Sequence, residues 1–239
     1  MPALPIGDCI KFGWETFKRR PGILIGAFAL VILVSAIPGI LTPHPEVVQG
    51  QPPPPPSPFA IVMGLISLLV NFLVALGFTN FSLHAHDNIE TVTIGDLWNP
   101  APVWRFLGAE LLMVLVFFVA SLLLAIPVAV LWFISAKLAI FIGVPLVLIP
   151  IIILGLGLTF APYLIVDRGM QPVGSLKESW RITDGNKWRI FLLGLALLGI
   201  NILGVLAIVI GVLVSVPITL LAVVHAYRFL QAAAGPTPA

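Results

Sequence analysis

The chain has 239 residues, of which 59% are hydrophobic and 9% are charged, and its mean hydropathy is +1.13. Soluble domains are usually about 25% charged, so this composition excludes an ordinary soluble protein and predicts an integral membrane protein. The formal net charge of +2 gives no electrostatic basis for nucleic-acid binding, and we expect the lipid bilayer to be the main partner.

The segment before the first long apolar run predicts an amphipathic helix. Ile6, Ile10, Trp14 and Phe17 recur at helical spacing, which places them on one face and leaves the charged residues on the other. We expect this helix to lie at the membrane surface, with Trp14 at the cytoplasmic interface. The single cysteine, Cys9, is expected on the polar side as a free thiol, with palmitoylation and metal binding as the alternatives.

Two apolar stretches follow, residues 22–41 and 59–83, and each is long enough to span the roughly 30 Å hydrocarbon core as a helix. Between them we predict an external loop over residues 42–58. Its run Pro52–Pro56 favours the extended polyproline conformation. This conformation suits a stiff spacer and, as the alternative, a ligand for a groove-binding partner.

Three polar residues close the second crossing, namely His84, His86 and Asp87. Histidine and aspartate are common metal ligands, but two histidines separated by one residue lie about 200° apart on a helix. We therefore interpret these residues as a polar helix end at the aqueous interface, and we predict no metal or cofactor.

Residues 106–166 form one apolar region that is long enough for two or three crossings. Arg105 before it and Arg168 after it are both expected in the cytoplasm, which requires an even number of crossings. We therefore predict two long helices, at about 105–133 and 138–166, joined by a short external turn.

That turn is expected at residues 135–137. Prolines are expected to kink or break both helices, and a re-entrant piece near 127–145 is the alternative to two complete crossings. The four prolines are Pro127, Pro145, Pro150 and Pro162.

The longest charged segment, residues 167–186, contains a second amphipathic pattern. One helical face is apolar, and the charged residues, Glu178 included, are expected outside it. The run Asp184–Asn186 fits a helix stop. The apolar face is formed by Val173, Leu176, Trp180 and Thr183.

Residues 188–230 are expected to form two more crossings, with a tight turn in the region 199–211 and Pro217 inside the sixth helix. The tail, residues 231–239, is rich in alanine and proline and is expected to be disordered.

The basic residues predict the orientation of the chain. Six crossings place eleven of the twelve lysines and arginines on one side of the membrane and only Lys137 on the other. By the positive-inside rule the first side is cytoplasmic, so we expect both termini there. The predicted fold class is an all-α membrane protein with six transmembrane helices as three hairpins, and with short amphipathic interfacial helices before the first and third hairpins.

A short pattern, Gly followed by Asp or Ser ahead of an apolar run, occurs three times in the chain. We predict a single integral membrane domain over residues 1–230, built from repeats at about 5–84, 93–166 and 172–230. The pattern is typical of helix starts, because Asp and Ser oxygens accept hydrogen bonds from first-turn N–H groups. The capping residues would be Asp8, Asp96 and Ser175.

Few polar groups fall within the apolar runs, and each is a candidate intramembrane polar site. Asn71 and Asn201 lie deep, and we expect each to hydrogen-bond a neighbouring helix. Glu110 and His225 are shallow. We expect Glu110 to pair with Arg105 at the cytoplasmic side, with a functional role as the alternative.

Several short motifs mark the cytoplasmic segments. They are Gly13-Trp14, Asp167-Arg168-Gly169, Leu176-Lys177-Glu178-Ser179-Trp180, Thr183-Asp184-Gly185-Asn186 and Tyr227-Arg228. Together they resemble a group of bacterial six-helix membrane families of unknown function that are related to the membrane domain of glycerophosphoryl diester phosphodiesterase. The resemblance implies a six-helix architecture and a bacterial inner-membrane location. It implies no catalytic residue, because we expect no room for the soluble phosphodiesterase domain after Leu230.

The residues expected at a cytoplasmic interface are Trp14, Asp167, Arg168, Trp180 and Asn186.

For function, we predict a non-catalytic scaffold or accessory subunit that binds lipids, other membrane proteins or further copies of itself, because charges within the spans are scarce and glycines are frequent. The alternative is a transporter or channel for small solutes or ions, which would use Asn71, Glu110, Asn201 and His225. An intramembrane enzyme is a third class, and no nucleophile with an orienting base supports it.

Overall fold

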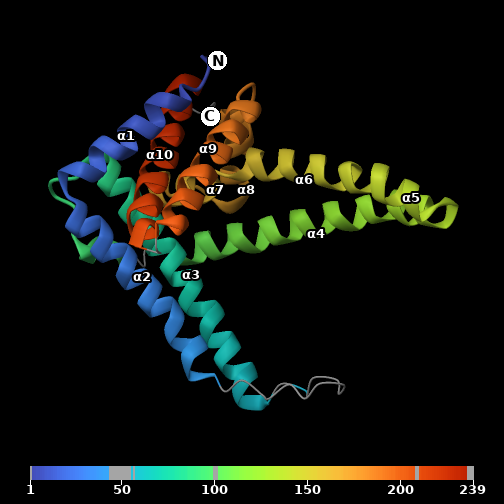
Figure 1. Cartoon of the computed structure of the whole chain (residues 1–239), viewed down its shortest axis with the longest axis horizontal. Helices are drawn as coiled ribbons and strands as arrows, with labels where there is room; N and C mark the ends of the chain where they lie inside the picture. Colours follow the sequence, from blue (N-terminus) through green and yellow to red (C-terminus); the bar gives the residue numbers. More distant parts are fainter. Residues whose placement is uncertain (1, 43–54, 56, 99–101, 208–209, 236–239) are drawn as a thin grey trace.

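The structure is a computed structural model that describes residues 2–42, 55, 57–98, 102–207 and 210–235. Within these residues the chain is helical and contains no strand (Figure 1). Six helical stretches of the described residues are long and apolar enough to cross a membrane, which confirms the all-α class and a multi-pass membrane protein. The proline-rich run Pro52–Pro56 lies almost entirely outside the described residues.

The helices follow the apolar runs of the sequence closely, with short pieces between them. In chain order they are α1 Ile6–Arg19, α2 Pro21–Leu41, α3 Pro58–Asp87, the 3₁₀-helix η1 Ile94–Leu97, α4 Val103–Ile134, α5 Ala136–Leu138, the π-helix η2 Ala139–Gly143, α6 Val144–Leu158, α7 Ala161–Arg168, α8 Pro172–Thr183, α9 Lys187–Leu206 and α10 Ile210–Ala234.

Consecutive long helices contact one another, α2 with α3, α4 with α6, and α9 with α10. Figure 1 shows the α2–α3 and α4–α6 pairs extending in different directions from a shared centre, while α1 lies along α10. The largest cluster of buried apolar side chains lies at this centre and includes residues of the N-terminal segment, α7, α9 and α10. In contrast, no residue of the most apolar 18-residue stretch of α4 is buried.

Two of the four prolines of the central region coincide with interruptions. Pro127 lies inside α4, which continues without interruption to Ile134, and the chain reverses at the extended residue Ser135. Pro145 is the second residue after the π-helix η2, and Pro162 follows a break that separates α6 from α7. A proline lacks the N–H group and clashes with the carbonyl four residues earlier, which explains both interruptions.

Of two predictions near the C-terminus, the structure agrees with one. Helix α9 continues through Asn201 to Leu206 and α10 begins at Ile210, so the connection falls within the predicted region 199–211. Helix α10 contains Pro217 as predicted but continues to Ala234. The prediction of a disordered tail is therefore wrong for residues 231–234, and residues 236–239 lie outside the described part.

Helix α1 packs along α10 through a buried face of three small residues and one phenylalanine. Cys9, Gly13, Thr16 and Phe17 are buried, whereas Trp14 is 47% exposed. A Cβ atom on Gly13 would lie 2.6 Å from the carbonyl oxygen of Ile218, so only glycine allows this approach. The predicted polar location of Cys9 is wrong. The face of α1 that is buried is the one that allows the backbones of α1 and α10 to approach closely, and side-chain hydropathy does not determine it.

Burial gives Cys9 a testable property. Burial, together with the charge of Asp8, raises the pKa of the Cys9 thiol to about 11. A rise of two units above the ordinary value lowers the thiolate fraction at neutral pH about 100-fold. We expect maleimide to label Cys9 in the folded protein at least 100-fold more slowly than an exposed thiol, measured by mass spectrometry. A Lys11→Cys/Cys9→Ser variant supplies that exposed thiol on the same helix, and equal rates would contradict the packing of α1.

Helix α8 is more buried than its pattern predicts. Glu178, expected outside, is only 4% exposed and forms an ion pair with Arg181 at 2.7 Å. The hydrogen bond from the Arg181 guanidinium to the Glu178 carboxylate raises the pKa of Arg181. The ring of Trp180 packs directly over Gly157 of α6. After Thr183 the chain turns at Gly185, whose φ of +74° is the left-handed conformation expected of a helix stop.

The three copies of the short sequence pattern have different local structures. Asp8 caps nothing, and the hydroxyl of Ser175 donates to the carbonyl of Pro172, so the predicted capping role is wrong for both. Asp96 does accept from a backbone N–H, that of Thr93, at 2.7 Å, within a capping box. Partial burial by itself raises the pKa of Asp96, but the hydrogen bonds with Thr93 and His84 outweigh this effect, and the pKa of Asp96 is lowered.

Candidate functional site

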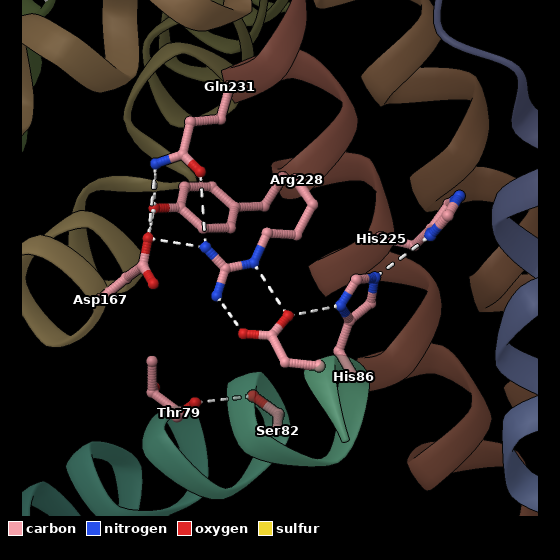
Figure 2. A network of polar contacts seen from close by, with 9 residues as sticks. Thr79, Ser82, His86, Asp167, His225, Arg228 and Gln231 are labelled. Carbon is pink, nitrogen blue, oxygen red and sulfur yellow. Dashed lines mark hydrogen bonds and ion pairs between the residues drawn. The ribbon is translucent and has the colours of Figure 1, made fainter. Parts of the chain in front are cut away.

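The C-terminal ends of α3, α7 and α10 meet in a polar network centred on Arg228 (Figure 2). The Arg228 guanidinium donates to both carboxylate oxygens of Asp87 on α3, at 3.2 and 2.5 Å. Its Nη1 also donates to Asp167 on α7 at 2.8 Å. One cation on the last helix is therefore shared by carboxylates from the first and second helix pairs.

A second layer of polar groups supports Asp167. Tyr227 is fully buried, and its hydroxyl donates to Asp167 at 2.8 Å. The amide oxygen of Gln231 accepts from Nη2 of Arg168 at 2.8 Å, and it lies 2.8 Å from the same Tyr227 hydroxyl. We call the set Asp87, Asp167, Arg168, Tyr227, Arg228 and Gln231 the junction. Its two carboxylates and two guanidinium groups balance in charge.

Two imidazoles extend the junction toward α1. His86 on α3 and His225 on α10 lie 3.2 Å apart, measured between Nε2 and Nδ1. The other ring nitrogen of His86 lies 2.9 Å from Asp87, which links the pair to Arg228. Phe12 of α1 stacks on His225 with ring centroids 4.3 Å apart. Helices α1, α3 and α10 therefore meet through aromatic rings.

The four predicted intramembrane sites do not come together. Asn71 bonds the carbonyl of Ser67 in its own helix, so the predicted contact with a neighbour is wrong. Asn201 does contact a neighbour, donating to Thr219 of α10 at 3.0 Å. Glu110 is half-buried on α4. His225 belongs to the imidazole pair.

The expected pairing of Glu110 with Arg105 is also wrong. Arg105 instead donates to the carbonyl oxygen of Gly169, just after α7. A backbone carbonyl at a helix C-terminus carries partial negative charge, so it competes with a carboxylate for the guanidinium.

The predicted cytoplasmic interface divides into separate parts. Asp167 and Arg168 are in the junction. Trp180 packs against α6 and contacts Lys187 through its ring face, with Nζ 4.3 Å from the centroid. Asn186 is buried and accepts from the backbone N–H of Leu4 at 2.9 Å, so it fixes the N-terminal segment.

The sequence patterns assign two members of the junction, Asp167 and Arg168, to a site and miss the other four. They indicate only a polar helix end at Asp87, a short motif at Tyr227-Arg228 and a disordered tail at Gln231. The available signal was the position of each polar residue at the end of an apolar run. The pairing depends on how the helix ends are brought together, which no local pattern encodes.

Arg20 forms a further link near the junction. Its Nη1 donates to the carbonyl oxygens of Ile89, Glu90 and Val92, at 3.2, 2.7 and 3.2 Å. The start of α2 is thereby joined to the segment after α3. Within the described part of the chain, no group of three or more histidine, cysteine or acidic side chains is placed to hold a metal ion.

Comparison with known proteins covers nearly the whole chain. Residues 4–238 match the family described as "Domain of unknown function (DUF7847)". Neither the comparison with curated proteins nor the comparison with solved structures produced a match. The match includes every helix of the fold and all members of the junction, and the chain therefore belongs to the DUF7847 family.

Proposed function

We propose that this protein is a non-catalytic scaffold or accessory subunit of the bacterial inner membrane that binds lipids or other membrane proteins. The observation that supports it most is the distribution of polar groups. They gather where the helix ends meet, around Arg228, while the long helices present aliphatic flanks. Such a distribution favours a joint between membrane helices over a reaction centre.

In this proposal the three helix pairs are membrane hairpins whose connected ends lie at the cytoplasmic side. Helices α1 and α8 would lie at that interface, and both termini would be cytoplasmic. The distribution of basic residues supports this orientation, because only Lys137 lies at the far end, beside the turn at Ser135. The resemblance to membrane domains of bacterial phosphodiesterases supports the inner-membrane location.

Helix α4 offers the most accessible flank for a partner. Leu115, Phe118 and Leu122 are 55–63% exposed and fall at helical spacing on one face. Beside α2 and α3 lies an apolar cavity of about 330 Å³, closed on one side by Leu97 and Trp98. Both surfaces suit acyl chains or the helices of another membrane protein.

Among the described residues, no specific contact favours the transporter alternative. The Asn71 amide donates within its own helix, the Asn201 amide donates to Thr219, and His225 contacts His86. These contacts connect none of the three groups to Glu110. A conduction path would need these groups to line one continuous space.

The proposed orientation predicts a labelling pattern. In a Cys9→Ser background, a membrane-impermeant maleimide added to intact cells should label Lys137→Cys, whereas Lys177→Cys should react only after the cells are opened. Both positions are exposed lysines, so they form a matched pair. Labelling of both from the outside would contradict the proposed crossing between these two positions.

The binding role is tested by extraction into native nanodiscs. We expect a stoichiometric membrane protein or lipid species to copurify with the wild type and to be lost from the triple variant Leu115→Ala, Phe118→Ala and Leu122→Ala. Alanine substitution of the equally exposed α9 residues Leu195, Leu198 and Ile202 is the matched control. Solute flux in reconstituted vesicles that is abolished by Glu110→Gln would instead support the transporter alternative.

A further inference from the structure

The imidazole pair beside the junction has a defined proton arrangement. Asp87 is a carboxylate engaged by Arg228, so the ring nitrogen of His86 that faces it, Nδ1, must carry the proton and donate. The Nε2 atom of His86 then has a free lone pair and accepts from Nδ1–H of His225 at 3.2 Å. Figure 2 shows the side chains of Arg228, His86 and His225 in this order, and the carboxylate of Asp87 links the first two.

This arrangement accepts one additional proton but not two. The first can be placed on Nε2 of His225, and the bond from Nδ1–H to His86 is kept. The second can only be placed on Nε2 of His86, where it would face the N–H of His225 across 3.2 Å. Two donors and two positive charges would then oppose each other, and the hydrogen bond between the two rings would be lost.

The charged groups around the pair lie on four segments. Helix α1 contributes Asp8, whose charge acts on His225, as well as Glu15 and Arg19, which line a cavity of about 160 Å³ beside His86. Glu90 lines the same cavity from the loop after α3. Asp87 and Arg228 complete the set from α3 and α10. The acidic groups favour uptake of the first proton by the imidazole pair. The guanidinium groups oppose uptake of the second proton. The cavity gives water access to His86.

We propose that His86 and His225 form an acid-sensitive latch that holds α3 against α10 at neutral pH and releases it when both rings are protonated. The inference rests on the proposed scaffold role, because it assigns a regulation to the joint between the helix pairs. In the unfolded chain each imidazole takes up a proton independently near its ordinary pKa of about 6.5. The folded chain binds fewer protons over that range, so its stability decreases as the pH falls through it.

The test measures the separation of the two helix ends directly. Spin labels are placed at Thr91→Cys, in the loop after α3, and Ala232→Cys, near the end of α10, in a Cys9→Ser background; both positions are exposed. Between pH 8 and pH 5 we expect a second, longer distance that reaches at least half of the molecules. It should be absent in His86→Asn, which keeps a polar group and cannot titrate. It should persist in His84→Asn, whose histidine contacts Asp96 and lies outside the pair.

A distance that is unchanged at pH 5, or an acid response that is equal in His86→Asn, would overturn the latch. Arg228→Met measured at pH 8 separates this inference from the scaffold proposal. If that variant lengthens the distance while acid does not, the latch alone is wrong. If neither the Arg228→Met substitution nor acid changes the distance, the junction does not hold the helix pairs together, and both proposals are overturned.

Discussion

Replacement of Arg228 by methionine is expected to destabilise the fold by about 2–4 kcal/mol, because it leaves the carboxylates of Asp87 and Asp167 without their shared cation. Removal of one partner from a fully buried ion pair costs about 3–5 kcal/mol. The expected loss for Arg228→Met extends below this range because the Asp87 side chain is 48% exposed, so solvent screens its charge. The Asp167 side chain is only 16% exposed and is screened less. The measurement is the midpoint of unfolding in detergent, which should fall by roughly 5–10 °C.

A matched control distinguishes the junction from a general effect of charge. Lys177→Met removes an exposed cation from α8 and should change stability by no more than about 0.5 kcal/mol. Addition of Asp87→Asn and Asp167→Asn to the Arg228 variant should recover part of the loss, since the uncompensated charges are then absent. Equal stability of Arg228→Met and Lys177→Met would show that the junction contributes nothing.

Substitution of Gly13 by alanine is expected to displace α1 from α10. The added Cβ would lie 2.6 Å from the carbonyl oxygen of Ile218, which is backbone and cannot move independently of the helix. Overpacking of this kind typically costs about 1–3 kcal/mol. Displacement of α1 should also expose Cys9, so its labelling by maleimide should become at least tenfold faster than in the wild type.

Gly7→Ala is the matched control on the same helix. No atom lies within 4 Å of a Cβ built at Gly7, so alanine should stabilise α1 by about 0.5–1 kcal/mol through helix propensity alone. The two substitutions are chemically identical and should change the free energy of unfolding in opposite directions. If Gly13→Ala is as stable as Gly7→Ala and Cys9 remains slow to react, α1 does not pack closely against α10.

The junction is the part of this protein that local patterns describe least well. Asp87 ends one apolar run, Asp167 ends another, and Arg228 lies 61 residues beyond Asp167 in the chain. Each is compatible with an ordinary polar helix end. A position predicted from sequence carries no information on partners that are far away in the chain, because the contact depends on the crossing geometry of three helix pairs. The same limit explains the wrong pairing of Glu110 with Arg105.

The sequence by itself determined the membrane class, the six apolar helices and most of their bounds, because long apolar runs in a helix satisfy their own backbone hydrogen bonds and need no distant partner. Only the tertiary structure decided which face of α1 is buried and which charges meet. Cys9 and Gly13 are inside because they allow the backbones of α1 and α10 to approach, a property of shape that hydropathy does not report. Arg228 joins Asp87 and Asp167 because folding brings three helix ends within the reach of one guanidinium group.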